Sequence, residues 1–363
     1  MESKVRVGVI GTSPFAEWMH LSPLASHPDA EITAICGRSR GRAEEVARRF
    51  GIPKVYSDAR ELIHSAVDAV VIVTPDDLHY PLTMQALGAG KHVFCEKALA
   101  MNQAQAREMY ETAEAKKRIH MTLFTFRVHP AFAQMRALVG EGYAGKLFQG
   151  QLSYLLSLGR NTAYQWRADS RHSNGMVADL GSHLVDLARL IFGEVRAVAA
   201  RNVFYNPRTL PDGGRLDQNN DSAVLLLEFV SGAQATFQVS ALAHQGDSYQ
   251  RIRVEANGSG GTLALDWPVR GGPLLVGARE EDQPLLPVAI PEALWRGADP
   301  ALDPPARFDR FYHIAPVGER LFIDSILSNT QPSPSFYDGW KAQQVIDAAL
   351  EASRTRQWVE VKE

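Results

Sequence analysis

The chain has 363 residues, of which 45% are hydrophobic and 22% are charged, and these proportions exclude disordered and fibrous classes. Its formal net charge of -3 gives no electrostatic reason to expect nucleic acid or an anionic membrane as a partner. A chain of this length is expected to form two domains. No apolar run reaches the length of a membrane span, so we expect a cytoplasmic protein. The two cysteines, Cys36 and Cys95, make neither a disulfide framework nor a metal site.

The first predicted element is a buried strand over residues 5–10, followed by a glycine-bearing turn and a helix. A helix that follows such a turn attracts phosphate through its unpaired backbone N–H groups. The dinucleotide pattern G-x-G-x-x-G/A is met at Gly11 and Ala16, but Ser13 replaces the middle glycine. The residues expected at the cofactor are Gly11, Thr12, Ser13, Phe15 and Ala16. An ordinary strand, turn and helix without a ligand is the alternative.

The next predicted strand, residues 31–36, ends in the sequence Gly37-Arg38-Ser39-Arg40. In nicotinamide-binding folds an acid at this position binds the ribose of NAD, whereas a nearby arginine accommodates the 2′-phosphate of NADP. Because no acid is present, we expect Arg38 and Ser39 at the cofactor and favour NADP over NAD. The alternative is that the arginines here belong to a solvated start of the next helix, residues 43–50.

Strands and helices continue to alternate up to about residue 126. Strands are predicted over 67–73, 92–95 and 120–126, and helices over a segment ending at 89 and over 102–117. This alternation predicts a doubly wound parallel sheet, in which ligands bind beyond the carboxyl ends of the strands. The residues after these strands that we expect at the cofactor are Thr74, Pro75, His79, Glu96 and Lys97.

After residue 126 the pattern changes to consecutive strands. A helix over 131–139 precedes strands predicted over 146–158, 197–205, 222–229, 233–242, 250–256 and 262–266. Little helix separates them, which predicts a mostly antiparallel sheet. We therefore expect a Rossmann domain over residues 1–126 and an α+β substrate-binding domain over 127–363, with a large open, mostly antiparallel sheet.

The last part of the chain is predicted to be irregular first and helical afterwards. Residues 268–316 hold nine of the 20 prolines, and we expect them to form a long irregular excursion over the surface. Helices over 317–329 and 338–354 and a strand over 357–361 then close the chain. The helix near 338–354 is free to pack back on the first domain.

One predicted helix, residues 178–193, carries a polar stripe beside its apolar one. At about 100° per residue, Asp179, His183 and Asp186 share a face next to the leucines. This position predicts half-buried side chains at a cleft between domains. A carboxylate four residues before a histidine contacts it across one turn and raises its basicity. The alternatives are a surface Asp–His pair and a helix cap at Asp179.

Lys97 and His183 together suit hydride chemistry at a carbinol. The lysine would bind and polarise the hydroxyl oxygen, and the histidine would take the hydroxyl proton as general base. The alternative for Lys97 is a solvated side chain. We do not expect a metal, because His79, His172 and His183 are not in ligand spacing, and the elbow motif of serine hydrolases is missing.

On these motifs the sequence resembles the glucose-fructose oxidoreductase, inositol dehydrogenase and MocA (Gfo/Idh/MocA) family. The motifs that carry the resemblance are Gly8-Val-Ile-Gly11-Thr12, Thr74-Pro75 with His79, Gly90-Lys-His-Val93 leading to Glu96-Lys97, Gly175 to Asp179 with His183 and Asp186, and Tyr337-Asp338-Gly339. The resemblance implies that Lys97 and His183 act at the reacting hydroxyl and that Asp179 positions the substrate. It also implies that Glu96 lies near the nicotinamide, and that Trp166 and Arg167 contact substrate or cofactor.

The resemblance further implies an NAD(P)-dependent dehydrogenase for a secondary hydroxyl of a sugar, cyclitol or related polyol, assembled as a homodimer or homotetramer through the second-domain sheet. Ala98 departs from the family, in which a proline, often with a cis bond, follows the lysine. The alternatives are reduction of an imine or enone, cleavage of a glycosidic bond by transient oxidation, or a cofactor-binding sensor without turnover. The presence of both Lys97 and His183 favours catalysis, because a sensor needs neither.

Overall fold

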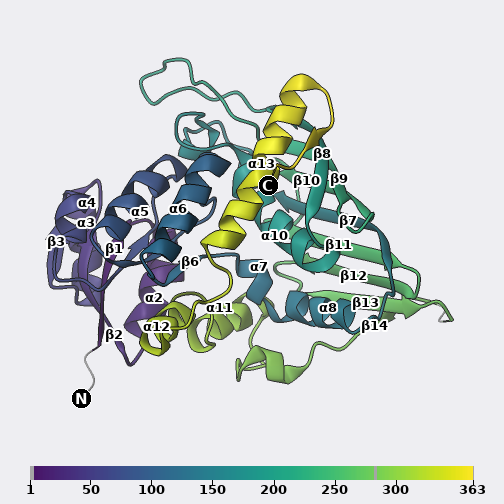
Figure 1. Ribbon diagram of the computed structural model, residues 1–363, viewed down its shortest axis with the longest axis horizontal. Helices are drawn as coiled ribbons and strands as arrows, with labels where there is room; N and C mark the ends of the chain where they lie inside the picture. The colour runs from purple at the N-terminus through teal and green to yellow at the C-terminus, as the bar shows by residue number, and fades with distance from the viewer. Residues whose placement is uncertain (1–3, 282–283, 363) are drawn as a thin grey trace. The chain divides into compact units, whose positions relative to one another are not determined.

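Strand β1 (Val5–Ile10) lies inside a six-stranded sheet whose order is β3-β2-β1-β4-β5-β6 and whose strands are all parallel. The other strands are β2 (Ala30–Cys36), β3 (Lys54–Tyr56), β4 (Ala69–Ile72), β5 (His92–Cys95) and β6 (His120–Thr122). This order confirms the predicted doubly wound sheet. The computed structural model describes residues 4–281 and 284–362 (Figure 1).

Helical segments follow each strand of this sheet. They are α1 (Pro14–Ala16), η1 (Glu17–Leu21), α2 (Ser22–Ala25), α3 (Arg40–Phe50), α4 (Ala59–Ile63), η2 (Asp76–Leu78), α5 (His79–Gly88) and α6 (Gln103–Ala115). Strand β3 and helix α4 were not predicted, because they are too short to show a period. Helix α3 begins earlier than the predicted residue 43, because Ser39 caps it by accepting a hydrogen bond from the Arg42 N–H (3.4 Å).

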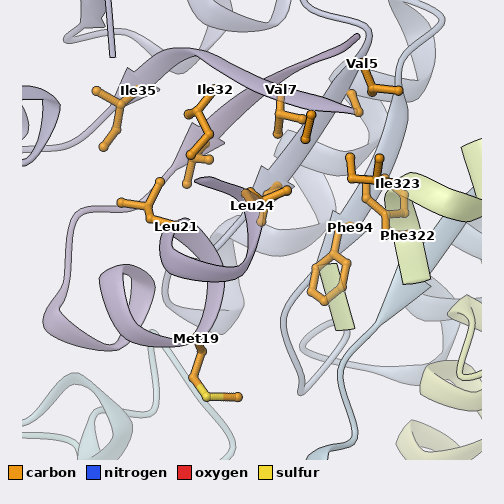
Figure 2. Close-up of a cluster of buried hydrophobic side chains, with 14 of the residues drawn as sticks. Val5, Val7, Met19, Leu21, Leu24, Ile32, Ile35, Phe94, Phe322 and Ile323 are labelled. Carbon is orange, nitrogen blue, oxygen red and sulfur yellow. The ribbon is translucent and has the colours of Figure 1, made fainter. Parts of the chain in front are cut away.

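Apolar side chains cover both faces of the parallel sheet, as strands buried on both sides require. On one face Val7, Leu24 and Phe94 belong to a cluster that also takes in Phe322 and Ile323 of α12 (Gly318–Ser328) (Figure 2). The rings of Phe94 and Phe322 meet edge to face, with centroids 5.6 Å apart. The second face packs on side chains from α4, α5 and α6.

The chain divides into two compact units. The first unit runs up to Leu123 and takes in Tyr312–Lys341, and the second comprises Phe124–Phe311 and the residues from Ala342 onward. The first unit also contains α12, which lies within the range 127–363 given above for the expected second domain. Helix α12 belongs to it because its apolar face completes the core over β1 and β5.

A nine-stranded sheet forms the second unit, in the order β14-β13-β12-β11-β7-β10-β9-β8-β15 (Figure 1). Among the described strands of this sheet only β7 and β10 pair in parallel, which confirms the predicted mostly antiparallel sheet. Its strands are β7 (Leu147–Leu156), β8 (Val195–Val203), β9 (Ser222–Phe229), β10 (Gln234–Ser240), β11 (Gln250–Gly258), β12 (Gly261–Pro268), β13 (Leu274–Arg279), β14 (Leu286–Pro287) and β15 (Val359–Glu360).

The helices outside the parallel sheet include two that pass from one unit to the other, α11 and α13. In chain order they are α7 (Thr125–Val128), α8 (Pro130–Gly140), η3 (Trp166–Ala168), α9 (Met176–Asp179), α10 (Gly181–Phe192), η4 (Glu292–Trp295), α11 (Pro304–Ile314) and α13 (Phe336–Thr355). Helix α7 takes the place of the predicted end of the 120–126 strand. Over the described part of the chain, every helix is too short or too polar to cross a bilayer.

The prediction of an irregular surface excursion over 268–316 is wrong. Strand β13 extends the large sheet beside β12, and η4 and α11 follow. Trp295 and Phe311 are only 4% and 2% exposed, and their rings lie 6.2 Å apart. The prolines hid this order because they interrupt any long periodic pattern, although most of them stand between or at the ends of the elements.

Candidate functional site

The turn after β1 requires glycine at its first position. Gly11 has a φ of +138°, and a Cβ there would lie 2.3 Å from the Val73 carbonyl oxygen. Ser13, which departs from the fingerprint, is the helix N-cap, and its Oγ accepts a hydrogen bond from the Ala16 N–H at 3.1 Å. Pro14 then occupies the first helical position, where proline is tolerated. The N-cap hydrogen bond thus explains why a serine can replace the middle glycine of the fingerprint. The tight turn at Gly11 is of the kind that accommodates the phosphates of a dinucleotide.

Two residues of this turn differ in exposure. Ala16 is buried, whereas Phe15 is 38% exposed and contacts the ring of His20 edge to face, with centroids 5.7 Å apart. Helices α1, η1 and α2 follow one another without a break from Pro14 to Ala25. The turn is therefore anchored by a continuous helical segment, and the Phe15 ring remains accessible to a ligand.

The arginines after β2 differ in their partners. Arg40 binds Glu44 at 2.9 Å, and Arg42 binds Glu45 at 2.8 Å and also pairs with Glu17. Among the residues that the structure describes, none forms an ion pair with the exposed Arg38. Arg38 is therefore the guanidinium of this group that is available to an anion, and Ser39 beside it caps α3.

Gly37, at the tip of β2, packs against the side chain of Thr12. A Cβ at Gly37 would lie 2.6 Å from the Cγ2 and 2.8 Å from the Oγ1 of Thr12. Any residue larger than glycine, including an acid, would displace this threonine.

His79 lies beneath the ends of β4 and β5 and not at the surface. It is fully buried, with Nδ1 2.8 Å from the Ala98 carbonyl oxygen and Nε2 2.9 Å from the Thr74 carbonyl oxygen. Burial by itself lowers the pKa of His79, but Cys95, Asp76 and the Ala98 carbonyl raise it to about 10. The histidine therefore joins the Thr74-Pro75 turn to the segment after β5.

Glu96 and Lys97 follow β5 directly, at the carboxyl edge of the parallel sheet. The Lys97 N–H donates to the Glu96 carboxylate at 3.1 Å, and the peptide bond between Lys97 and Ala98 is cis. Glu96 is 5% exposed and lies 3.1 Å from the Nε2 of His20. The Lys97 side chain is half-buried.

His20 lies between two carboxylates in the interior of the first unit. Its other ring nitrogen forms an ion pair with Glu319 of α12, whose carboxylate also accepts a hydrogen bond from the Tyr312 hydroxyl at 3.0 Å. Burial lowers the pKa of His20, but the carboxylates of Glu319 and Glu96 outweigh it and raise this pKa to about 10. Burial and Glu319 raise the pKa of Tyr312 well above its usual value.

We expect the free energy of unfolding to fall as the pH rises from about 7 to about 10. Folded His20 and His79 each keep a proton up to a pH of about 10, against an ordinary pKa of 6.5. The stabilisation is therefore complete below the ordinary pKa and is lost as the pH rises to the folded one, at about 1.4 kcal/mol per pH unit for each histidine. Urea denaturation at several pH values in this range measures the change. Stability that stays constant or increases would contradict the protonation of His20.

In the second unit, the structure brings Trp166, Arg167 and Asp179 together. The Arg167 guanidinium lies over the Trp166 ring, 4.3 Å from its centroid, and its Nε is 3.0 Å from an Asp179 oxygen. Arg167 is partly exposed, whereas the Asp179 side chain is nearly buried. Asp179 ends α9, so it is not the helix cap that was one alternative.

His183 and Asp186 are more deeply buried than predicted. His183 is 7% exposed and lies against the Phe126 ring, with centroids 4.8 Å apart. Asp186 is fully buried, and its carboxylate accepts hydrogen bonds from Arg127, one of them at 2.9 Å from Nε. Half-burial was expected because the helical arithmetic considered only α10, whereas α7 covers its polar stripe.

Two residues near His183 were not found from the sequence. Arg127 holds Asp186 in place, and Tyr154 of β7 has its ring 6.3 Å from His183. Burial, together with the Asp179 carboxylate, raises the pKa of Tyr154. The Tyr154 hydroxyl donates to Gln250 at 3.3 Å. Arg127 follows Phe126 in an apolar stretch, and this unusual position was the one available signal.

The predicted site residues thus fall in both units, Lys97 in the first and His183 in the second. Each unit presents its own group of contacts, with the cofactor residues in the first and Trp166, Arg167, Asp179 and His183 in the second. Within the described ranges, no three histidine, cysteine or acidic side chains gather as a metal ion would require.

Two family sequence profiles match the chain. Residues 5–124 match that of an oxidoreductase family with an NAD-binding Rossmann fold, and residues 132–264 match a GFO/IDH/MocA C-terminal domain.

Named enzymes are also similar to the chain. Myo-inositol 2-dehydrogenase of Thermotoga maritima is 31% identical over 72% of this chain and 75% of its own length. Levoglucosan dehydrogenase of Pseudarthrobacter phenanthrenivorans is 28% identical over 88% of this chain and 86% of its own length. A solved structure of levoglucosan dehydrogenase with NADH and levoglucosan has a TM-score of 0.87 and 26% identity, and the match covers 99% of this chain and 100% of that one.

Proposed function

Because the chain belongs to the Gfo/Idh/MocA family of oxidoreductases, we propose that it is an NAD(P)-dependent dehydrogenase acting on a secondary hydroxyl of a sugar, cyclitol or related polyol. The observation that carries this proposal is the position of Lys97 directly after β5. The carboxyl edge of a parallel sheet is where such folds bind their ligands. Relatives named for levoglucosan and myo-inositol support the substrate class.

In the proposed reaction three side chains of the protein have separate roles. Lys97 donates to the hydroxyl oxygen and polarises it, and His183 accepts the hydroxyl proton as the C=O bond forms. Asp179, oriented by Arg167, accepts a hydrogen bond from the substrate and so fixes its orientation. When bound, the cofactor supplies the hydride acceptor for the hydrogen that leaves the carbon. Atoms and charge balance, because one hydride and one proton leave the alcohol.

NADP is the cofactor we propose in preference to NAD. Its support is the exposed Arg38, which forms no ion pair within the described part of the chain, and the sequence Gly37-Arg38-Ser39-Arg40 after β2, which contains no acid. NAD binding is consistent with the matching Rossmann profile, and a related structure contains NADH. The choice between the two cofactors therefore depends on Arg38.

Replacing Arg38 with alanine should weaken NADP binding by tenfold or more, because a hydrogen bond to a charged group contributes about 1.5–3 kcal/mol to the free energy of binding. NAD affinity should change by less than about threefold, since NAD lacks the 2′-phosphate. Fluorescence titration of both reduced cofactors measures the effect. Arg40→Ala is the matched control, because Arg40 is paired with Glu44. Equal losses for both cofactors would refute the 2′-phosphate assignment.

We also propose that the protein acts in the cytoplasm as a homodimer or homotetramer formed through the large sheet. Support for assembly comes from Val224 and Leu226 of β9, which are 50% and 47% exposed. The two buried, free cysteines support a reducing compartment. The molecular mass in solution checks the assembly, and the mass of a single chain would contradict it.

Nicotinamide absorbance during a screen of sugars, anhydrosugars and cyclitols tests the proposed activity. A substrate-dependent change in absorbance with either cofactor is the expected result. Tight cofactor binding without turnover on any of these compounds would instead favour the sensor. Turnover only on imines or enones would move the reaction to another class.

A further inference from the structure

The residues on both sides of Lys97 are each held by a buried histidine. Before it, the Glu96 carboxylate lies 3.1 Å from His20 Nε2. After it, the Ala98 carbonyl oxygen lies 2.8 Å from His79 Nδ1. Both histidines are 0% exposed, so neither reaches a ligand. Any effect they have on the reaction must act through the residues that they hold.

The contacts of each ring require a doubly protonated imidazole. His79 faces carbonyl oxygens with both nitrogens, those of Ala98 and Thr74. A carbonyl oxygen can only accept, so both nitrogens donate. The two ring nitrogens of His20 instead form ion pairs with the carboxylates of Glu96 and Glu319, which favour the protonated ring. Two buried cations therefore lie on the two sides of the segment that carries Lys97.

The groups around each histidine are themselves anchored. On the His20 side, the Tyr312 hydroxyl donates to Glu319, and both side chains are essentially inaccessible. On the His79 side, the charged or titratable neighbours are the buried Asp76 and Cys95. A buried charge is costly unless it is paired and hydrogen-bonded. His79 is hydrogen-bonded through both ring nitrogens, and His20 forms an ion pair with a carboxylate on each side.

We propose that His20 and His79 are positioning residues that fix the Lys97 backbone between Glu96 and Ala98, and so set the aim of its ammonium group. This inference rests on the proposed function of Lys97. The link on the Glu96 side is direct, because the Lys97 N–H donates to the same carboxylate that His20 holds. On the Ala98 side the link is the next carbonyl group along the chain.

His79→Phe and His79→Gln form the main test. Phenylalanine removes both hydrogen bonds, whereas glutamine retains a donor for one carbonyl. We expect His79→Phe to lower kcat by about tenfold or more, since small displacements of reacting groups are costly. KM for sugar and cofactor should stay within about threefold, and glutamine should restore part of kcat. Rates are divided by the concentration of cofactor-binding sites, titrated by fluorescence, so misfolded protein does not contribute.

Tyr312→Phe is a second variant for the same test, and His120→Gln is its control. Tyr312→Phe deletes only the hydroxyl that anchors Glu319, and we expect about a threefold lower kcat with unchanged KM. His120→Gln is the control, because His120 is equally buried in the first unit but contacts Glu114, Gln331 and Phe336 instead. It should lower the melting temperature without changing kcat per binding site.

Lys97→Ala, measured in parallel, separates the two proposals. If it abolishes turnover while His79→Phe and Tyr312→Phe keep full kcat, positioning is overturned and the function of Lys97 stands. If it retains turnover, the function of Lys97 fails, and this inference fails with it. Equal losses of kcat in His79→Phe and His79→Gln would also overturn positioning by hydrogen bonds.

Discussion

Lys97→Ala should lower kcat by about 100-fold or more on any sugar or polyol that the protein oxidises. The substitution removes the donor that polarises the hydroxyl oxygen, and with it the charge that stabilises the developing alkoxide. Cofactor affinity is titrated in parallel, because Lys97 is also one of the residues expected at the cofactor. Steady-state and single-turnover rates measure the loss.

The matched control for this variant is Lys116→Ala, which removes an exposed lysine just beyond the end of α6. Its kcat should equal that of the wild type. A loss below about threefold in Lys97→Ala would remove the lysine from the proposed reaction. The comparison is sound because both variants delete the same charge from the same unit.

His183→Ala should also cost about 100-fold in kcat near neutral pH, because no other base is assigned to the hydroxyl proton. The deficit should shrink as the pH rises, since hydroxide in solvent increasingly replaces the missing base. A pH series of kcat with a saturating substrate measures this trend. A constant deficit across the series would point to a packing role against Phe126 and would contradict general-base catalysis by His183.

Cofactor affinity is the internal control for His183→Ala. The predicted cofactor residues lie in the first unit, whereas His183 lies in the second. Its removal should therefore leave the dissociation constant of the reduced cofactor unchanged. A large loss of affinity would indicate that the variant disturbs the fold and not only the proton transfer.

Much of the fold was predictable because local signals and the global fold agree. The Val- and Ile-rich strands β1 and β4 and the alternating strands of the second unit are readable over short windows. Strand β13 was missed because prolines and glycines surround it. Strand β3 and helix α4, of three and five residues, show neither a continuous apolar run nor enough positions for a period.

Individual residues of the candidate site could be predicted from the sequence, but the contacts between them could not. Lys97 and His183 stand out by motif, and their roles stay predictions. The ion pairs found near these residues join distant parts of the chain, as Arg127 does with Asp186 and His20 does with Glu319. No spacing rule connects such residues, because tertiary packing alone determines which of them meet.

The return of Tyr312–Lys341 to the first unit has a consequence for how this protein can be divided. A fragment ending near residue 126 would expose the apolar surface that Phe322 and Ile323 cover, and it would leave His20 with a single carboxylate. The residues up to about 126 therefore cannot be moved into another protein as a complete domain. A chimera with another dehydrogenase should carry this late segment with the first half of the chain, although almost two hundred residues of the second unit separate them in the sequence.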